Sequence, residues 1–135
     1  MKIRNDILPD LSLNRPYQYQ CVDLFRAANA EYYRHVDWAL DISQGEFKEL
    51  DIRDVPVRLI RRDPETQFIV KREVALRGHW RNLDFRETLW RTWISEFLEH
   101  EEQDVVLVAP KRHPKFRSYL ADLQLLRRAG VAEPD

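Results

Sequence analysis

The chain has 135 residues, of which 44% are hydrophobic and 33% are charged, and its formal net charge is −1. This composition excludes the low-hydropathy, highly charged class of disordered proteins, and the balanced charge points to no particular partner. The length fits one domain that covers residues 1–135.

Cysteine and glycine are scarce, and this excludes several classes of site. The single cysteine, Cys21, excludes an internal disulfide framework, and the N-terminal residues lack the apolar run of a signal peptide. We therefore expect a soluble, cytoplasmic protein with no membrane partner. The three glycines are isolated, so the P-loop and the dinucleotide-binding fingerprint are absent. The common serine-hydrolase and zinc motifs are absent as well.

The first predicted element is one long amphipathic helix, or two shorter ones, between Pro16 and Gly45. Apolar residues recur three and four positions apart and predict a core-facing stripe: Cys21, Phe25, Ala28, Tyr32, Val36 and Ala39. Aromatic residues beside this stripe predict a second face that is typical of protein interfaces: Tyr17, Tyr19, Tyr33 and Trp38.

From Phe47 onward the apolar residues alternate with polar ones, which predicts an antiparallel meander of three strands. The third strand is expected over residues 67–77, after a turn at residues 61–66. A continuously apolar segment, DVVLVAP at residues 104–110, predicts a strand in the sheet interior with both faces covered.

Two further helices are predicted. A capping box formed by Asp84 and Glu87 predicts the start of one helix, whose apolar stripe places Trp90 and Trp93 in the core. The last helix begins near Phe116 and ends before Gly130. The predicted fold is a single α+β domain with a central, mostly antiparallel mixed sheet and helices on both faces, in the order α-β-β-β-α-β-α.

This order of elements resembles the core of the GCN5-related N-acetyltransferase fold, and LLRRAGV at residues 125–131 looks like the close of that family's last helix. The resemblance covers nearly the whole chain and implies an acyl-CoA-dependent N-acyltransferase, with acetyl-CoA or another acyl-CoA as cofactor and no metal. The family's glycine-rich pyrophosphate motif corresponds here to RGHWRN at residues 77–82, which carries the bulky Trp80. The family's tyrosine four residues before the terminal glycine is Leu126 here, so the resemblance implies a catalytically degenerate relative.

The resemblance also implies a site where two loops meet. If the strands at 67–77 and 104–110 run parallel, the segments that follow them converge at one end of the sheet, where anions bind. We then expect His79 or His113 to accept a proton from the amine. The expected cofactor-binding residues are Arg77, Arg81, Asn82, Lys111 and Arg112. The alternative is that these are solvated loop charges.

A non-catalytic interaction module is the other hypothesis. It takes the form of an inhibitor or adaptor that binds a partner protein or a second copy of the chain. A less favoured form binds nucleic acid through a basic, aromatic surface. Trp80 is the candidate for stacking on a base, because the helical periodicity does not assign it to a helix core. The four histidines form no convincing set of metal ligands, and the acidic residues at 99–104 indicate a frayed helix end.

Overall fold

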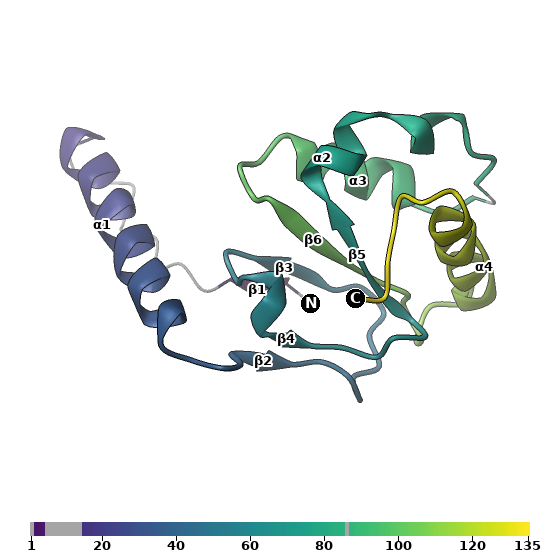
Figure 1. Ribbon diagram of the computed structural model, residues 1–135, viewed down its shortest axis with the longest axis horizontal. Helices are drawn as coiled ribbons and strands as arrows, with labels where there is room; N and C mark the ends of the chain where they lie inside the picture. The colour runs from purple at the N-terminus through teal and green to yellow at the C-terminus, as the bar shows by residue number, and fades with distance from the viewer. Residues whose placement is uncertain (1, 5–14, 86) are drawn as a thin grey trace.

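The computed structural model describes residues 2–4, 15–85 and 87–135, which form an α+β fold of short strands and helices (Figure 1). The strands are β1 (Lys2–Arg4), β2 (Leu40–Asp41), β3 (Asp51–Arg53), β4 (Ile60–Arg61), β5 (Gln67–Lys71) and β6 (Asp104–Val108). The helices are α1 (Arg15–Arg34), α2 (Arg72–Leu76), α3 (Trp90–Leu98) and α4 (Phe116–Arg128), with 3-10 turns η1 (Val57–Leu59) and η2 (His79–Asn82).

The middle of the fold is a ribbon of β5 and β6, which pair antiparallel with Phe68 opposite Leu107 and Ile69 opposite Val106. Successive side chains of a strand point to opposite faces. Phe68 and Leu107 therefore enter one hydrophobic cluster, and Ile69 and Val106 enter a second cluster on the other face. The prediction that DVVLVAP forms a strand covered on both faces is confirmed. Its predicted place in the sheet interior is wrong, because β6 pairs with β5 alone among the described strands, and a parallel arrangement of the two is wrong as well.

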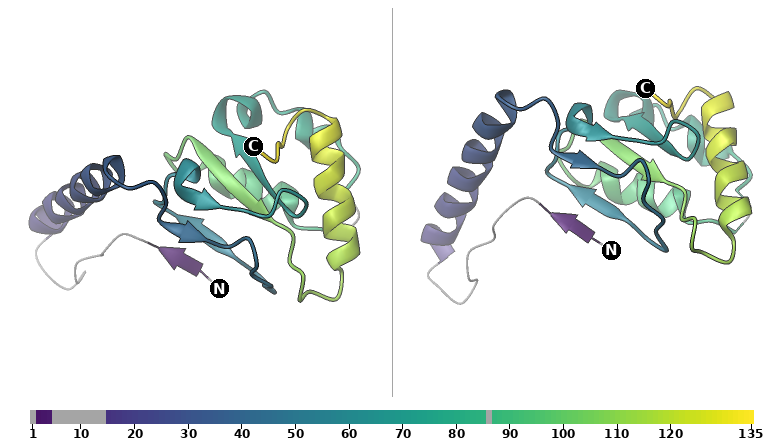
Figure 2. Two further views of the ribbon diagram at one scale, coloured as in Figure 1. Left: turned by 60° about the horizontal axis from the view of Figure 1, so that its bottom comes forward. Right: turned by 90° about the horizontal axis from the view of Figure 1, so that it is seen from below.

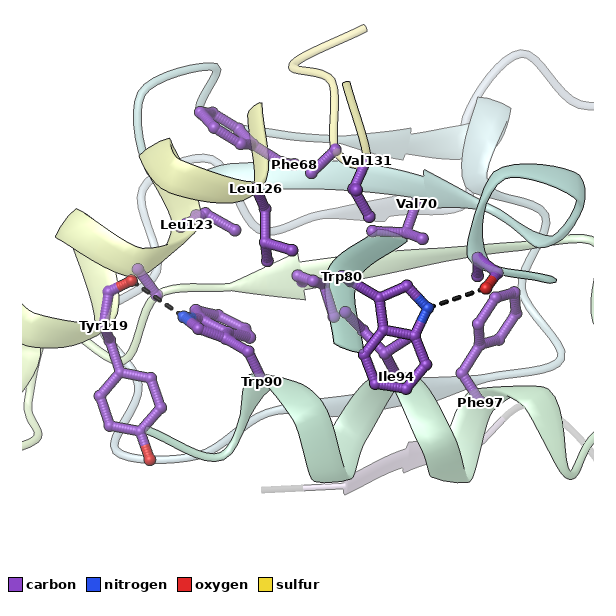
Figure 3. Close-up of a cluster of buried hydrophobic side chains, with 14 residues drawn as sticks. Phe68, Val70, Trp80, Trp90, Ile94, Phe97, Tyr119, Leu123, Leu126 and Val131 are labelled. Carbon is purple, nitrogen blue, oxygen red and sulfur yellow. Dashed lines mark hydrogen bonds between the residues drawn. The ribbon is translucent and has the colours of Figure 1, made fainter. Parts of the chain in front are cut away.

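Helices α2, α3 and α4 cover the first face, and two tryptophans fill the space between them and the ribbon (Figure 3). Trp80 and Trp90 are 1% and 0% exposed. Each indole N–H has an acceptor, because Trp80 Nε1 donates to Ala75 O at 2.8 Å and Trp90 Nε1 donates to Tyr119 O at 3.0 Å. The core position predicted for Trp90 is confirmed, and Trp80, which was considered for base stacking in the nucleic-acid hypothesis, is buried.

Short strands cover the second face, in place of the helices that the sequence pattern predicted. β1 pairs with β3 and β2 pairs with β4, both in parallel, and neither pair is hydrogen-bonded to the central ribbon as a sheet. Ile42, Val57 and Ile60 pack against Ile69 and Val106. The expected antiparallel meander is therefore not formed among the described residues.

Helix α1 ends at Arg34 instead of continuing toward Gly45, and it lies apart from the other elements in every view (Figures 1 and 2). Its last turn is held by Arg58, whose Nη2 donates to Tyr33 O at 2.7 Å. The predicted stripe is wrong at this end, because Tyr32 is 61% exposed and Tyr33 is 3% exposed. A helix that does not lie along the sheet has no reason to follow a core-facing period. The side chains of residues 15–23 and 25, including Cys21, fall outside the described part of the structure.

The strand expected over residues 67–77 ends at Lys71, and α2 follows directly. Arg72 explains the break, because its guanidinium donates to Leu98 O at 3.0 Å and to His100 O at 2.5 Å, at the end of α3. Gly78, with φ of 76°, ends α2 and begins η2. The sequence alternation placed Arg72 on the face of a strand. In the structure Arg72 instead begins α2 and contacts the end of α3.

The capping box predicted at residues 84–87 is not formed. α3 begins at Trp90, and Leu89 at its N-cap makes no side-chain cap. Glu87 has a left-handed φ of 56°, which is incompatible with a helix interior. Its carboxylate instead binds Lys115 Nζ at 2.7 Å.

The last helix is confirmed. It ends with Gly130 at φ of 72°, where Gly130 N–H donates to Arg127 O at 3.0 Å and Val131 N–H donates to Leu126 O at 2.9 Å. These two bonds form a Schellman motif. Within the described ranges, no helix has the length and apolar character needed to cross a membrane.

Candidate functional site

The residues expected to bind acyl-CoA fall into two separate groups. β5 and β6 are antiparallel, so the segment after β5 and the segment after β6 leave the ribbon at opposite ends. Among the described residues, no hydrogen bond or ion pair joins the group at 77–82 to the group at 111–113.

The first group lies on the surface around η2. Arg77, His79 and Asn82 are exposed. The guanidinium of Arg81 lies 4.7 Å from the centre of the Trp80 ring, and the Arg81 N–H donates to Gly78 O at 3.0 Å. The Arg81 amide, in the segment that corresponds to the family's pyrophosphate motif, is therefore already bonded within the turn.

The second group is engaged with its own neighbours. Lys111 Nζ lies 3.2 Å from Asp63 Oδ2, and the Arg112 N–H donates to Phe47 O at 3.0 Å. His113 Nδ1 accepts from the Lys115 N–H at 3.0 Å, and its ring lies 5.1 Å from the ring of Tyr119. These contacts hold the loop between β6 and α4.

A cavity of about 70 Å³ lies on the side of β6 away from β5. Its walls are β3 with its flanking residues, η1, Ile60 of β4, α3, Glu102 and β6, and no residue of β5 lines it. The lining residues combine charged and apolar groups: Glu49, Leu50, Asp51, Ile52, Arg53, Asp54, Val55, Val57, Ile60, Trp93, Glu96, Phe97, Glu102, Asp104, Val105, Val106, Leu107 and Val108. The cavity thus lies at the edge of the central ribbon, between the helical layer and the layer of short strands.

The charges in this lining are strongly unequal. Six lining residues are acidic and one, Arg53, is basic. Arg53 is already paired, since its Nε lies 2.9 Å from Asp51 Oδ1. A cleft with one sign of charge and walls of low dielectric concentrates the field and attracts ligands of the opposite sign. We refer to this site as the acidic cavity.

Glu102 gives the acidic cavity a specific unmet requirement. Its Oε2 atom is buried and has no hydrogen-bond donor within the described part of the chain. A buried polar atom without a partner costs about 1–3 kcal/mol, and more when the group is charged. Trp93 and Phe97 supply apolar surface in the same lining. A ligand that carries a cationic donor on an apolar stem satisfies both features, as the side chains of lysine and arginine do.

A second hollow lies beside η1 and the C-terminal residues, and its lining includes the basic residues Arg58, Arg61, Arg62 and Lys71. These cations are used within the chain. Arg61 stacks on Trp38 with 4.7 Å between the guanidinium and the ring centre, and Arg62 Nη1 donates to Ile60 O at 2.9 Å. Lys71 Nζ lies 3.7 Å from Glu133 Oε2. Arg62 Nε is buried and has no acceptor within the described part of the chain, whereas Nη1 and Nη2 of the same guanidinium donate to backbone carbonyl groups.

The sequence contained a signal for the acidic cavity that periodicity alone did not reveal. Acidic residues alternate with apolar ones from Glu49 to Ile52, Asp54 follows after Arg53, and a second acidic run precedes β6. We interpreted the second run as a frayed helix end, and it does follow the end of α3 at Leu98. The proximity of the two runs depends on the packing of β3 beside β6, which no local pattern records.

Within the ranges that the structure describes, no three His, Cys, Asp or Glu side chains are grouped to hold a metal ion. Comparisons with protein-family models, with curated protein sequences and with solved structures found no match to this chain.

Proposed function

We propose that this chain is a non-catalytic interaction module that binds a positively charged segment of a partner protein in the acidic cavity. The observation that carries the proposal is the buried Glu102 Oε2 without a donor, in a lining of six acidic residues and one basic residue. A cationic side chain that enters the cavity supplies the missing donor and offsets the surrounding charge.

The apolar part of the lining favours a protein segment over a small inorganic cation. Trp93, Phe97 and Val106 lie in the same lining as the carboxylates. Interfaces of proteins combine apolar anchors with a charged rim, and the rim charges govern association rate and specificity.

The acyltransferase hypothesis stays a prediction. Its two groups of residues lie at opposite ends of the β5–β6 ribbon, and the Arg81 amide is bonded to Gly78. Its test is calorimetric titration with acetyl-CoA, repeated with Arg81→Glu and Arg112→Glu. Saturable binding that both substitutions abolish would replace our proposal with the acyltransferase hypothesis.

The proposed module is tested with a fluorescein-labelled octapeptide of alternating lysine and valine, measured by fluorescence anisotropy. We expect saturable binding that weakens at high salt, since exposed charges are screened. The same peptide with glutamate in place of lysine should not bind. Glu96→Lys, at the exposed rim of the cavity, should weaken binding at least tenfold, which corresponds to about 1.4 kcal/mol.

Glu65→Lys is the matched control, because Glu65 is exposed and does not line the acidic cavity. It makes the same change in net charge and should alter the affinity far less than Glu96→Lys does. Equal effects of the two substitutions, or no binding of the lysine peptide, would refute the proposal.

A further inference from the structure

We infer that the partner segment binds as an added β-strand along the edge of β6 that faces away from β5. This inference rests on the proposed function and specifies how the acidic cavity is used. It follows from the direction of the backbone groups of β6, from the pairing of the opposite edge of the ribbon, and from the charge of the lining.

The register fixes which backbone groups of β6 point outward. Ala109 N–H donates to Thr66 O at 2.9 Å, and Arg72 N–H donates to Gln103 O at 2.6 Å. In an antiparallel pair, hydrogen-bonded and non-hydrogen-bonded residue pairs alternate. Val105 and Leu107 therefore direct their N–H and C=O groups toward β5. Their neighbours direct these groups away from it, into the side where the acidic cavity lies: Asp104, Val106 and Val108.

The other edge of the ribbon shows how such outward groups are satisfied. Ile69, opposite Val106, points its backbone groups away from β6. There Ile69 N–H donates to Glu133 O at 2.6 Å, and Glu133 N–H donates to Ile69 O at 2.9 Å. The C-terminal segment of the chain thus closes the edge of β5.

The edge of β6 has no such closure within the described residues. No described group hydrogen-bonds to the outward N–H and C=O of Val106 and Val108, although these residues are only 9% and 6% exposed. Backbone polar groups in buried surroundings are almost always paired, and leaving them unpaired costs free energy. An added strand supplies donors and acceptors at the spacing that this edge requires.

The acidic cavity lies along this same edge. β3 forms its far wall but is not hydrogen-bonded to β6. Because β3 is paired through only three residues with β1, it is the wall that moves when a strand enters. Side chains of an added strand would point alternately toward α3, where Glu96 lies, and toward the apolar residues Val57 and Ile60.

The charge of the lining decides between a basic partner and a second copy of this chain. Pairing two β6 edges would bring the carboxylates beside each edge, including Asp104, against those of the other copy. Like charges opposite one another are destabilising in a sheet, and opposite charges stabilise it. An extended segment with lysine or arginine at alternate positions is complementary to this edge.

The test uses the full chain and two N-methylated forms of the lysine–valine octapeptide, one methylated at every valine and one at every lysine. Alternate amides of a strand point to the same edge, so only one form blocks the bonds to β6. We expect one form to lose at least tenfold in affinity and the other to keep most of it. Equal affinities of the two forms would refute strand addition.

Amide hydrogen exchange measured by NMR gives an independent readout. Peptide binding should slow exchange at Val106 and Val108 at least tenfold and leave Val105 and Leu107, already bonded to β5, little changed. Another outcome is that the unmodified peptide binds, with binding weakened by Glu96→Lys, while the two methylated forms bind equally and exchange at Val106 and Val108 is not slowed. In that case the module stands and strand addition is wrong. If the unmodified peptide does not bind, both the module and strand addition are refuted.

Discussion

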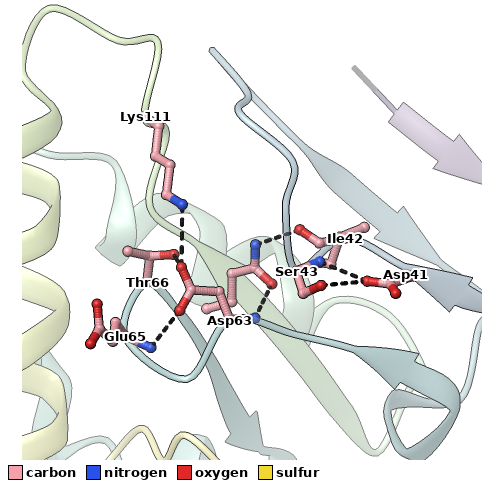
Figure 4. Close-up of polar contacts among 8 residues, drawn as sticks. Asp41, Ile42, Ser43, Asp63, Glu65, Thr66 and Lys111 are labelled. Atoms are coloured by element: carbon pink, nitrogen blue, oxygen red, sulfur yellow. Dashed lines mark hydrogen bonds and ion pairs between the residues drawn. The ribbon is translucent and has the colours of Figure 1, made fainter.

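Asp63 ties the turn before β5 to the loop after β6 (Figure 4). Its Oδ1 accepts from the Glu65 N–H at 3.0 Å, and its Oδ2 accepts from Thr66 Oγ1 at 2.8 Å and from Lys111 Nζ at 3.2 Å. Burial alone raises the pKa of Asp63, but these hydrogen bonds and the Lys111 charge outweigh it and hold the pKa below its usual value.

Asp63→Asn should therefore destabilise the protein in a pH-dependent way. A carboxyl whose pKa is lower in the folded state stabilises that state above its unfolded pKa of about 3.9. This contribution is lost as the pH falls through the folded pKa. We expect the variant to be about 1–2 kcal/mol less stable at pH 7 and the difference to shrink near pH 3. Urea denaturation at both pH values measures it.

Glu65→Gln is the control for this experiment, since the Glu65 side chain is exposed and only its backbone N–H takes part in the turn. Its stability should follow that of the wild type at both pH values. If Asp63→Asn lowers the free energy of unfolding equally at pH 3 and pH 7, the charge of Asp63 does not stabilise the fold.

At the scale of elements, Arg72 joins the start of α2 to the end of α3. The last carbonyl groups of a helix have no partner within it, and the helix dipole favours a cation beside them. The guanidinium of Arg72 donates to Leu98 O, His100 O and Glu102 O at 3.0, 2.5 and 3.4 Å. It also lies 5.9 Å from the centre of the Phe97 ring. One side chain thus ends α3 and orients the acidic segment that leads to β6.

Arg72→Ala should lower the free energy of unfolding by about 1–2 kcal/mol, because it leaves these carbonyl groups without their donor. Arg72→Lys should recover only part of the loss, since an ammonium lacks the fork that reaches several carbonyls. Arg77→Ala, at an exposed position after α2, should change stability by less than about 0.5 kcal/mol. Thermal and urea denaturation compare the three variants, and equal effects at 72 and 77 would contradict this role.

The elements that the sequence predicted well are those whose pattern is set by their own burial. β6 is continuously apolar because both its faces are covered, and α4 shows a clear stripe and a glycine at its end. The end of β5 was missed because Arg72 is determined by a tertiary contact with α3. The C-terminal end of α1 was missed because that helix lies apart from the sheet, so the exposure of its described residues Leu24, Tyr32 and Tyr33 does not follow the predicted stripe (Figure 2).

The candidate site was harder to predict than the elements. The two loops expected to converge depend on strand direction, and the antiparallel pairing of β5 and β6 separates them. Trp80 looked free because no helix stripe includes it, yet it is buried by the fold-back of η2. The acidic cavity joins residues 49–54 to residues 96–108, and only long-range packing brings these segments together.

On the scale of the whole molecule, the β5–β6 ribbon supplies side chains to both hydrophobic clusters. Phe68 belongs to the helical side, and Ile69 belongs to the side of the short strands. Gln67, which is 0% exposed, adds a polar link: its Nε2 donates to Ile42 O at 2.8 Å, and its Oε1 accepts from the Asp63 N–H at 2.8 Å. Because the two clusters share one ribbon, we expect them to unfold together.

Gln67→Leu tests this shared stability. It leaves the Ile42 carbonyl and the Asp63 amide without partners, so the free energy of unfolding should fall by about 2–4 kcal/mol. Trp38 stacks on Arg61 of β4, so this experiment and the next use a Trp38→Phe background. Tryptophan fluorescence then reports the helical side through Trp80, Trp90 and Trp93, and far-UV circular dichroism reports the whole chain. Both urea midpoints should shift by the same amount, whereas Gln44→Leu, at an exposed position, should shift neither.

Ile42→Val gives a milder perturbation of the same side, and it keeps the experiment decisive if Gln67→Leu does not fold. Ile42 is 2% exposed in the cluster of the short strands, and the loss of one methylene there should cost about 1 kcal/mol. The tryptophans of the other cluster should register this loss, because Ile42 packs in the same cluster as Ile69 of the ribbon that supports both sides. A fluorescence transition that stays at the wild-type midpoint while the dichroism transition moves would show that the two clusters unfold separately.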